Sequence, residues 1–416
     1  MKKIWIINHN AMPPSLGGLN RHHYFSKYLA QEGYFVRIIT ASNVHNSGVN
    51  IISGKEPYCE KECDGIVYTF VRTAEFTGHG LSRIKNIMEF LLRLWGICKA
   101  FGMTEGYPDV IYTSSPDIFA CFQAIRISKK LKTPCIFEVR DLWPESIVAY
   151  GLKSKRNLII KAMYKMEKWM YTQADKLIFT SEGGKDYIVE CGWDKTIKQD
   201  KIYHIGNGLD LSEFDYNLKT FSIDERALDD ENSFKGVYVG SMRHVNNIEV
   251  LVEAAEILQD RKRDFILILF GDGGSTERVQ AMIEEKRISN VILRQRVEKK
   301  FVPYILSKAD FCILHFRQSS LLRYGHSSNK LCDYLAAGKP VLSDLVVSHD
   351  IIKQHDCGIA ISSQTPEAIA NGIEKMMDMP ETEHTAFGQN ARKAAVMYDY
   401  KALTHKLIEI IEDLIA

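Results

Sequence analysis

Long hydrophobic runs are missing from this sequence of 416 residues. The apolar run near its start, Ile4–Ile7, is too short for the core of a signal peptide. No other stretch approaches the roughly 18–20 uncharged residues that a helix needs to cross a membrane. The sequence therefore predicts a cytoplasmic protein without a membrane-spanning helix.

An excess of charge of one sign is also missing. The chain has 53 Lys and Arg residues against 52 Asp and Glu residues, which gives a net charge of +1. A surface that binds nucleic acid through its phosphates needs a basic excess. We therefore expect no nucleic acid among the partners, although a local basic patch is compatible with a balanced total.

Clusters of metal ligands are scarce. Among the nine Cys residues only Cys59 and Cys63 are close neighbours in the sequence, and no second ligand pair accompanies them. A structural zinc site normally has four ligands. The sequence also contains no Asp-x-Asp motif, a common magnesium or manganese ligand set. We therefore expect no metal, no cofactor and reduced thiols of the kind found in cytosolic proteins.

Short apolar runs, by contrast, alternate with helical patterns along the whole chain, as expected for strands buried on both faces of a parallel sheet. Helical periodicity is clear at, for example, Arg21–Glu32, Asn247–Leu258 and Ser328–Ala337. We expect strands at Ile4–Ile7, Phe35–Thr40, Ile66–Phe70, Val110–Thr113, Cys135–Val139, Leu177–Thr180, Gly236–Val239, Phe265–Phe270, Val291–Leu293, Phe311–His315, Pro340–Leu342 and Gly358–Ser362. The alternation predicts an α/β fold with two Rossmann-like, doubly wound domains that face a central cleft.

The two copies of this pattern set the expected domain boundaries. We expect an N-terminal domain at 1–211, a polar interdomain connection at 212–233 and a C-terminal domain at 234–395. The last segment, 396–416, contains an amphipathic helix over Ala402–Ile415. This closing helix could pack on either domain, the N-terminal domain included.

Ligands of doubly wound sheets bind beyond the carboxyl ends of the strands, so the loops at those ends are the candidate sites. After the first strand, Gly17 and Gly18 precede a helix that begins near Arg21. Two glycines allow a backbone to approach a ligand closely and to donate N–H groups to an anion. A plain connection between strand and helix is the alternative.

A second loop, after Cys135–Val139, is rich in functional groups. It holds Arg140, Asp141, Trp143 and Glu145. Such a loop at a strand end favours binding or catalysis. The alternative is a structural ion pair between Arg140 and Asp141, with Trp143 packed in the core.

The second half of the chain has a third group of candidates at its strand ends and at one helix start. A cation in the first turn of a helix works against the helix dipole, so Lys330 suggests a role other than helix stability. Arg243 and Lys330 could clamp a diphosphate, with Asp333 one turn further for ribose hydroxyls. The group comprises Gly240, Arg243, Asn247, Gly271, Asp272, Ser327, Ser328, Asn329, Lys330 and Asp333.

Several of these segments resemble glycosyltransferase family 4. They are Asn207-Gly-Leu-Asp-x3-Phe214, the strand-Gly-x-x-Arg motif that ends at Arg243, Phe270-Gly-Asp-Gly273 and Asn329-Lys-Leu-x-Asp-Tyr-Leu-Ala-Ala-Gly-Lys-Pro-Val341. The segment Arg140-Asp-Leu-Trp-Pro-Glu145 is similar to members that build bacterial O-antigens and capsules. The resemblance covers nearly the whole chain.

The resemblance implies a GT-B fold and a retaining, metal-independent transfer of a sugar from a nucleotide-diphosphate donor. It places the acceptor in the N-terminal domain and the donor in the C-terminal domain, favours UDP, and implies a lipid-linked or oligosaccharide acceptor. We assign catalytic roles to Arg243, Lys330 and Asp141; donor binding to Gly17, Gly18, Gly240, Asn247, Gly271, Asp272, Arg296, Val297, Ser327, Ser328, Asn329 and Asp333; and acceptor binding to Arg21, Arg140, Trp143 and Glu145.

The sequence departs from the family pattern at two places. Members often carry Glu-x7-Glu, whereas here Gly325 stands in the first position and Asp333 in the second. The usual Arg plus Lys after the glycine loop is here Arg243 followed by Asn246 and Asn247, so we take Lys330 as the second cation. The missing Glu at 325 keeps a catalytically inactive nucleotide-sugar-binding partner subunit as an alternative. A GT-B nucleotide-sugar epimerase and a glycan phosphorylase are two further alternatives.

Two segments of the N-terminal domain suggest contact with a membrane. Residues 82–99 combine an apolar face with additional apolar positions, and residues 151–170 contain six basic residues against one acid among large apolar side chains. Basic amphipathic segments bind the surface of anionic membranes. We expect peripheral association with the inner face of the plasma membrane, against the alternative of two ordinary core helices.

Overall fold

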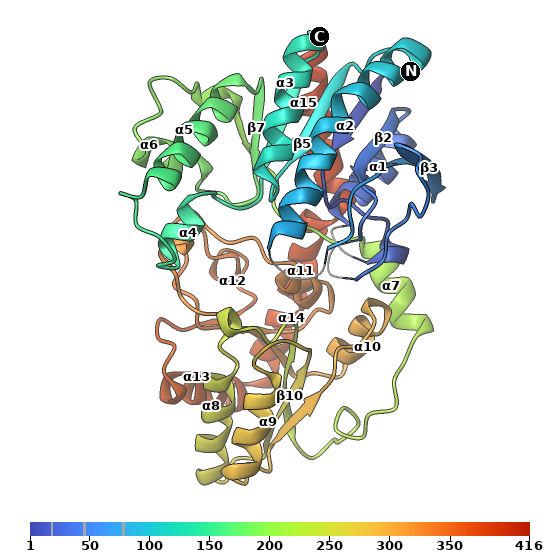
Figure 1. Cartoon of the computed structure of the whole chain (residues 1–416). Coiled ribbons are helices and arrows are strands. Elements are labelled where there is room, and N and C mark those ends of the chain that lie inside the picture. Colours follow the sequence, from blue (N-terminus) through green and yellow to red (C-terminus); the bar gives the residue numbers. More distant parts are fainter. Residues whose placement is uncertain (18–19, 45–46, 77–79) are drawn as a thin grey trace. The chain divides into compact units, whose positions relative to one another are not determined.

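The structure is a computed structural model that describes residues 1–17, 20–44, 47–76 and 80–416 (Figure 1). The chain forms two compact units, of which the first comprises residues 1–206 and 400–416 and the second comprises residues 207–399. The polar stretch at 212–233 lies in the second unit and begins within helix α7 (Leu211–Thr220). The closing helix α15 (Tyr400–Ile415) lies in the first unit.

The first unit is built on an eight-stranded sheet with the order β3-β4-β2-β1-β5-β6-β7-β8. Its pairs are parallel except for β3, which runs antiparallel to β4 at one edge. The strands are β1 (Lys3–Ile7), β2 (Phe35–Ala41), β3 (Tyr58–Cys63), β4 (Ile66–Val71), β5 (Val110–Ser114), β6 (Cys135–Val139), β7 (Lys176–Phe179) and β8 (Ile202–His204). The helices before the closing one are α1 (Arg21–Gln31), α2 (Leu81–Glu105), α3 (Ile118–Leu131), α4 (Glu145–Ala149), α5 (Leu158–Gln173) and α6 (Gly184–Glu190), with short 3-10 turns η1 (Pro14–Leu16) and η2 (Gln199–Lys201).

The strand register brings the loops after β1, β5 and β6 to the same edge of this sheet. Ile7 of β1 pairs with Thr113 of β5, which pairs in turn with Phe137 of β6. Two polar contacts then join the loops, because Asn8 Nδ2 donates to the Ser114 carbonyl over 2.9 Å and Arg140 N donates to Ser115 Oγ over 2.8 Å. Residues from three strands can therefore act on one ligand.

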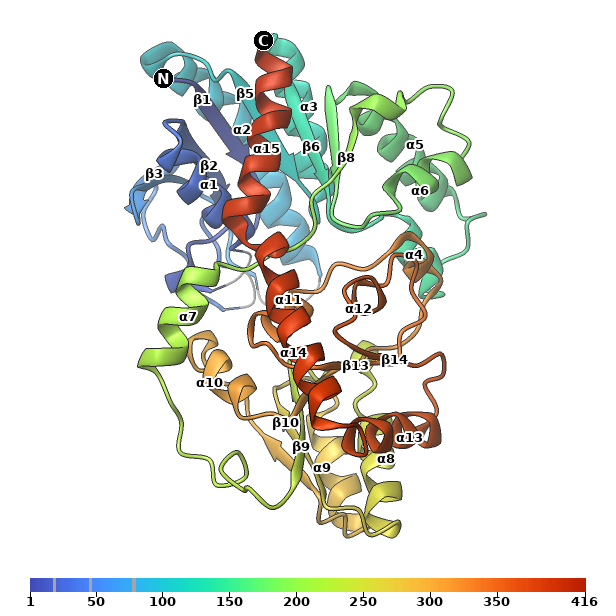
Figure 2. The same cartoon turned by 180° about the vertical axis from the view of Figure 1, so that it is seen from behind.

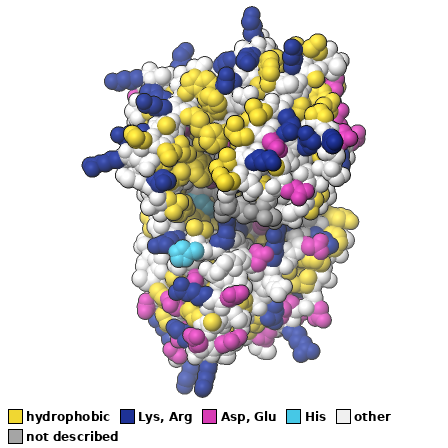
Figure 3. Space-filling view, viewed as in Figure 1, with side chains coloured by type: hydrophobic (Ala, Val, Ile, Leu, Met, Phe, Trp, Pro, Cys, Tyr) yellow, Lys and Arg dark blue, Asp and Glu magenta, His cyan; other side chains and the backbone are white. Residues whose placement is uncertain are grey.

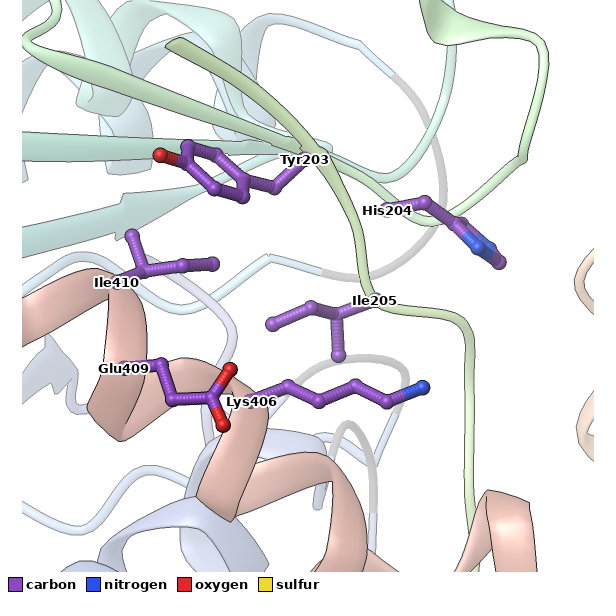
Figure 4. A pocket seen from close by; sticks show the side chains of 6 residues that line it. All are labelled: Tyr203, His204, Ile205, Lys406, Glu409 and Ile410. Atoms are coloured by element: carbon purple, nitrogen blue, oxygen red, sulfur yellow. The ribbon is translucent and has the colours of Figure 1, made fainter. Parts of the chain in front are cut away.

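The closing helix packs on α1 through apolar and aromatic side chains. The rings of Tyr24 and Tyr400 stack with centroids 4.8 Å apart, and Figure 2 shows α15 lying over the strands of the first unit. Beside β8 this helix leaves a pocket of about 420 Å³, in which Tyr203 and Ile410 lie next to each other while His204 points away (Figure 4). The amphipathic pattern at the C-terminal end of the sequence thus forms part of the core of the first unit.

The second unit is built on a parallel six-stranded sheet with the order β11-β10-β9-β12-β13-β14. Its strands are β9 (Phe234–Val239), β10 (Phe265–Phe270), β11 (Val291–Arg294), β12 (Phe311–Leu314), β13 (Val341–Ser343) and β14 (Gly358–Ala360). Besides α7, its helices are α8 (Glu249–Asp260), α9 (Thr276–Glu285), α10 (Val302–Ser307), α11 (Asn329–Ala336), α12 (Ile351–Gln354), α13 (Pro366–Met377) and α14 (Glu381–Ala395), and its 3-10 turns are η3 (His244–Asn246), η4 (Lys299–Phe301), η5 (Ser320–Tyr324) and η6 (Val396–Tyr398).

Strand β10 shows that this second sheet is covered on both faces. Leu267 and Leu269 pack with apolar residues of α8 and α13, whereas Ile268 and Phe270 pack with those of α10 and α11. Alternate residues of a strand point to opposite faces, so a continuous apolar run such as this one requires two helical layers. The prediction of doubly wound α/β domains is confirmed in both units.

All twelve strands that the sequence predicts are present, with ends that differ by a few residues at most. Strands β3 and β8 were not predicted. β3 is an exposed, charged edge strand that contains both Cys59 and Cys63, and β8 is only three residues long. Within the described part of the chain, no helix is both long and apolar enough to cross a bilayer.

Candidate functional site

Close backbone packing joins the loops after β9 and β10 in the second unit. A Cβ atom on Gly271 would lie 1.8 Å from the Gly240 carbonyl oxygen, and one on Gly273 would lie 2.5 Å from the carbonyl carbon of Met242. Met242 N donates to the Asp272 carbonyl over 2.7 Å. Only glycine fits at these places, so the Phe-Gly-Asp-Gly segment serves to bring two strand-end loops together.

Helix α11 brings Lys330 to these loops. Lys330 Nζ donates to Tyr238 Oη over 2.7 Å and lies 4.3 Å from the centre of the Tyr238 ring. A Cβ on Gly240 would lie 2.8 Å from Lys330 Cδ, so a side chain at 240 would displace the lysine. Burial, aided by the positive charge of Arg243, lowers the pKa of Lys330 to about 7.

Arg243 lies at the surface between β9 and η3, where its Nε donates to Ser241 Oγ over 3.0 Å. Among the described residues, neither Arg243 nor Lys330 has a carboxylate within ion-pair distance. Two cations without a counter-ion at adjacent strand and helix ends can bind an anion with two negative charges. The structure therefore brings together Gly240, Arg243, Gly271, Asp272 and Lys330.

The residues before Lys330 fix the start of α11. Ser327 Oγ accepts a hydrogen bond from Asn207 N over 2.7 Å, and Asn207 Nδ2 donates to the Ser327 carbonyl over 2.9 Å. Ser328 occupies the N-cap position without a side-chain cap bond, and Asn329 is exposed. The two Asn207 contacts give the Asn of the Asn-Gly motif a structural role at the start of α11.

Asp333 lies one turn along α11 and is half-buried. Burial raises the pKa of its carboxyl, and the charge of Lys299 opposes that effect. Arg296 is exposed after β11, and Val297 packs against the apolar core of the second unit. Gly325, which stands where the family often has Glu, has a φ of +91°.

A buried His–Asp pair supports the donor side and was missed by sequence analysis. His315 Nδ1 lies 2.5 Å from Asp344 Oδ2, and His315 Nε2 lies 3.0 Å from the carbonyl oxygen of Asn247. Asn247 itself is in the left-handed region with φ +48°. The pair thus fixes the loop that follows Arg243. The sequence could have indicated this pair, because His315 follows β12 directly and Asp344 follows β13 directly.

In the first unit, Arg21 is buried in an ion pair at the start of α1. Its Nε donates to Glu138 Oε1 over 2.7 Å, and its other nitrogens donate to the carbonyls of Ile205 and Gly206. Burial by itself would raise the pKa of Glu138, but Arg21 and His22 hold it well below its usual range. These contacts favour a structural role for Arg21 over the expected acceptor contact. Gly17 follows η1 with φ +71°, and Gly18 lies outside the described residues.

The loop after β6 carries side chains that are exposed and side chains that contact other residues. Asp141 is exposed, whereas the Glu145 carboxylate accepts from Tyr164 Oη and pairs with Lys155 Nζ at 3.0 Å. Arg140 Nη1 and Trp143 Nε1 are buried and have no hydrogen-bond partner in the described part of the chain. The alternative reading, a structural ion pair between Arg140 and Asp141, is absent among the described ion pairs, so both groups stay available to a ligand.

No group of three or more His, Cys, Asp or Glu side chains in the described ranges is placed to hold a metal ion. The Cys59 and Cys63 thiols are free, and burial raises the pKa of each. Arg243 and Lys330 are two positive charges that the second unit places beside its glycine loops.

Residues 16–213 match the family Glycosyltransferase Family 4, and residues 220–394 match Glycosyl transferases group 1. Each half of the chain thus matches a glycosyltransferase family model. The curated relative "Putative glycosyltransferase EpsD" of Bacillus subtilis (strain 168) is 24% identical over 253 residues, which make up 59% of this chain and 63% of that protein. The chain therefore spans less than two thirds of the length of this relative.

Solved structures show the fold of these glycosyltransferase domains. HepE of Anabaena in complex with UDP has a TM-score of 0.66 and 12% identity over 100% of both chains. WaaG, a glycosyltransferase involved in lipopolysaccharide biosynthesis, has a TM-score of 0.62 and 15% identity over 98% of this chain and 99% of that one. The chain has the GT-B fold, as the resemblance implied.

Proposed function

We propose that the protein transfers a sugar from a nucleotide-diphosphate donor, with UDP as the nucleotide, to a lipid-linked or oligosaccharide acceptor. The observation that carries this proposal is the placement of Lys330 and Arg243 beside the glycine loops after β9 and β10. The complex of HepE with UDP, a protein of the same fold, supports the choice of UDP.

The proposed chemistry follows from these two cations. When the glycosidic bond breaks, the β-phosphate of the donor gains negative charge, and fixed cations stabilise the transition state more than the bound donor. Arg243 offers a planar fork to two phosphate oxygens, and Lys330 adds a point charge. No metal is required for this step.

We propose that the sugar keeps its anomeric configuration. Inversion would need a side-chain base opposite the leaving group, and retention through a covalent intermediate would need a carboxylate nucleophile. Gly325 occupies the position at which the family often has its first Glu, so we assign Asp333 to the donor's hydroxyls rather than to covalent catalysis. The acceptor hydroxyl would attack from the side of the departing phosphate, and that phosphate would take the hydroxyl's proton. This route keeps the configuration and needs neither a side-chain base nor a carboxylate nucleophile.

We further propose that the first unit touches an anionic membrane and that the acceptor belongs to surface polysaccharide synthesis, such as O-antigen or capsule. Helices α2, α3 and α5 lie next to one another (Figure 1), and hydrophobic side chains gather along them in Figure 3. Leu81 and Leu92 on α2 are 84% and 76% exposed, and Leu158 on α5 is 80% exposed. The exposed Lys161 and Lys165 lie on α5 as well.

Exposed leucines beside lysines are typical of surfaces that insert shallowly into an anionic bilayer. Flotation with liposomes that contain or lack anionic lipid tests this part of the proposal. We expect binding that needs anionic lipid and is lost in Leu158→Glu combined with Leu92→Glu. Equal flotation with neutral lipid, or none at low salt, contradicts the membrane contact.

A thermal-shift screen of UDP-, GDP- and ADP-sugars tests the donor. A ligand that binds only the folded state raises the melting temperature, by an amount that grows with its concentration over Kd. We expect stabilisation by UDP-sugars that is lost in Arg243→Ala. Stabilisation by no nucleotide sugar would overturn the proposed function.

A further inference from the structure

The first unit contains a pocket of about 520 Å³ at the edge where β1, β5 and β6 end. This volume lies within the range of ligand-binding pockets in proteins. Its wall is mainly apolar, with Phe76, Ile84, Ile87, Ile118, Phe119 and Met163. Five residues with polar side chains also line the pocket: His9, Asn10, Arg83, Asp117 and Trp143.

His9 is held rigidly in this wall with one ring nitrogen unused. Its side chain is 95% buried, its Nδ1 lies 3.3 Å from Asp117 Oδ2, and its ring meets Phe90 edge-on at 4.9 Å. Asp117 is fixed in turn, because its Oδ1 caps helix α3. Among the residues that the structure describes, His9 Nε2 and Trp143 Nε1 have no hydrogen-bond partner.

The electrostatics favour a neutral His9. Burial lowers the pKa of its imidazole, Arg83 lowers it further, and Asp117, Asn86 and Asn10 oppose the shift. A neutral ring with its proton on Nδ1, toward Asp117, leaves a lone pair on Nε2. A buried acceptor without a partner is costly, so this nitrogen is poised for a hydroxyl of a ligand.

The mouth of the pocket continues into the exposed apolar side of α2. Leu81 and Ile84 line the pocket and yet are 84% and 58% exposed, so the same side chains face the cavity and the surface. A ligand with both hydroxyl groups and a hydrocarbon chain matches this arrangement. The hydroxyls would meet the polar groups, and the chain would leave along α2.

We propose that this pocket binds the acceptor, an amphipathic glycolipid, and that His9 Nε2 accepts a hydrogen bond from an acceptor hydroxyl group other than the one that attacks the donor. His9 then orients the acceptor, with Asp117 fixing the ring and its tautomer. This inference rests on the proposed function, since it names the acceptor class and one residue that contacts it.

Fluorine NMR on the full chain tests the pocket without the natural acceptor. The five tryptophans are replaced by 5-fluorotryptophan, and Trp143→Phe assigns the resonance of Trp143. Octyl glucoside, below its micelle-forming concentration, is the probe, and methyl glucoside and per-O-methylated octyl glucoside are its matched controls. We expect a saturable shift of the Trp143 resonance with octyl glucoside and much weaker binding of both controls.

Substitutions separate the hydrogen bond from the apolar contact. His9→Phe should weaken octyl glucoside binding about 3- to 10-fold, as expected for one hydrogen bond, and leave binding of the methylated probe unchanged. His9→Gln, which keeps an acceptor atom, should recover most of the difference. Ile87→Lys should abolish binding of both octyl probes, whereas Met103→Lys, on the same helix but outside the pocket, should not.

The outcomes also separate this inference from the proposed function. A Trp143 resonance that does not respond, or equal binding of the methylated and free probes to the unmodified chain, overturns the assignment to His9. Both results stand even if His9→Phe fails to fold. UDP-glucose binding is measured on the same samples: its presence without an octyl glucoside site refutes this inference alone, and its absence refutes the proposed function.

Discussion

Donor binding should depend on the protonation of Lys330. The pKa of this lysine is about 7 because its ammonium group is buried against Tyr238 and lies near Arg243 without a carboxylate partner. A bound diphosphate supplies the missing negative charge and raises the pKa toward the ordinary value. Below pH 7 the lysine is charged in both states, whereas above pH 7 the donor must bind together with a proton.

The magnitude follows from this shift. The affinity should fall close to tenfold for each pH unit above 7, or on the order of 50- to 100-fold between pH 6 and pH 9, since each pKa unit is worth about 1.4 kcal/mol. At pH 8 the uptake should approach one proton per molecule of donor bound. UDP-glucose suits the measurement because its diphosphate does not titrate in this range.

Isothermal titration calorimetry in buffers of different ionisation enthalpy measures the affinity and the proton uptake together. Lys330→Met keeps much of the side-chain volume and should bind weakly, with a flat pH profile and no proton uptake. A flat profile in the unmodified chain, with no proton taken up at pH 8, would show that Lys330 does not contact the diphosphate.

Four further results are expected. Arg243→Ala should reduce kcat about 10²- to 10³-fold in a folded protein, and Arg243→Lys should recover only part, because a point charge cannot replace the planar fork; a lowered Tm with unchanged kcat would make Arg243 structural. Asp333→Ala should raise the donor KM more than the acceptor KM, and an unchanged donor KM would contradict its assignment to the donor. Activity should survive EDTA, and loss on chelation that magnesium or manganese restores would reveal a metal site. Burial raises the pKa of Glu167 to about 8, although Tyr171 and Tyr187 donate to it over 2.8 and 2.9 Å. Between the ordinary pKa of a glutamate and pH 8, the folded chain keeps the Glu167 proton that the unfolded chain releases. The free energy of unfolding should therefore fall by up to about 1.4 kcal/mol per pH unit over this range. Denaturant unfolding should show Glu167→Gln gaining stability at pH 8 but not at pH 5, and equal gains at both would refute this explanation.

The sequence was a good guide to the fold because buried parallel strands are continuous apolar runs. β10, read as Phe265–Phe270, is found with those ends. β3 escaped notice because an antiparallel edge strand has one solvent face, and Glu60, Lys61 and Glu62 break the apolar pattern. The pairing of Arg37 with Glu60 across that edge depends on the tertiary structure, which no local pattern encodes.

The donor side could be predicted further than the acceptor side. Lys330 and Arg243 follow strand and helix ends whose positions the topology fixes, so their approach to one another was expected. By contrast, Arg21 lies at the predicted helix start but forms a buried ion pair with Glu138, more than a hundred residues away in the chain. His9 can be recognised as a candidate site residue only from its contact with Asp117, which lies on another loop at the same edge of the sheet. Pairs of this kind arise from strand register, which the sequence alone does not reveal.

The central claim, transfer of a sugar from a nucleotide donor, is tested most directly by following the sugar itself. Radiolabelled UDP-sugars are incubated with the protein and a bacterial lipid extract, in EDTA, and UDP release is compared with label in the extractable glycolipid. We predict one UDP released per sugar transferred, no product without the lipid extract, and at least a hundredfold less product with Arg243→Ala. Free sugar or an epimerised donor formed without acceptor, or donor binding with no transfer at all, would contradict the account.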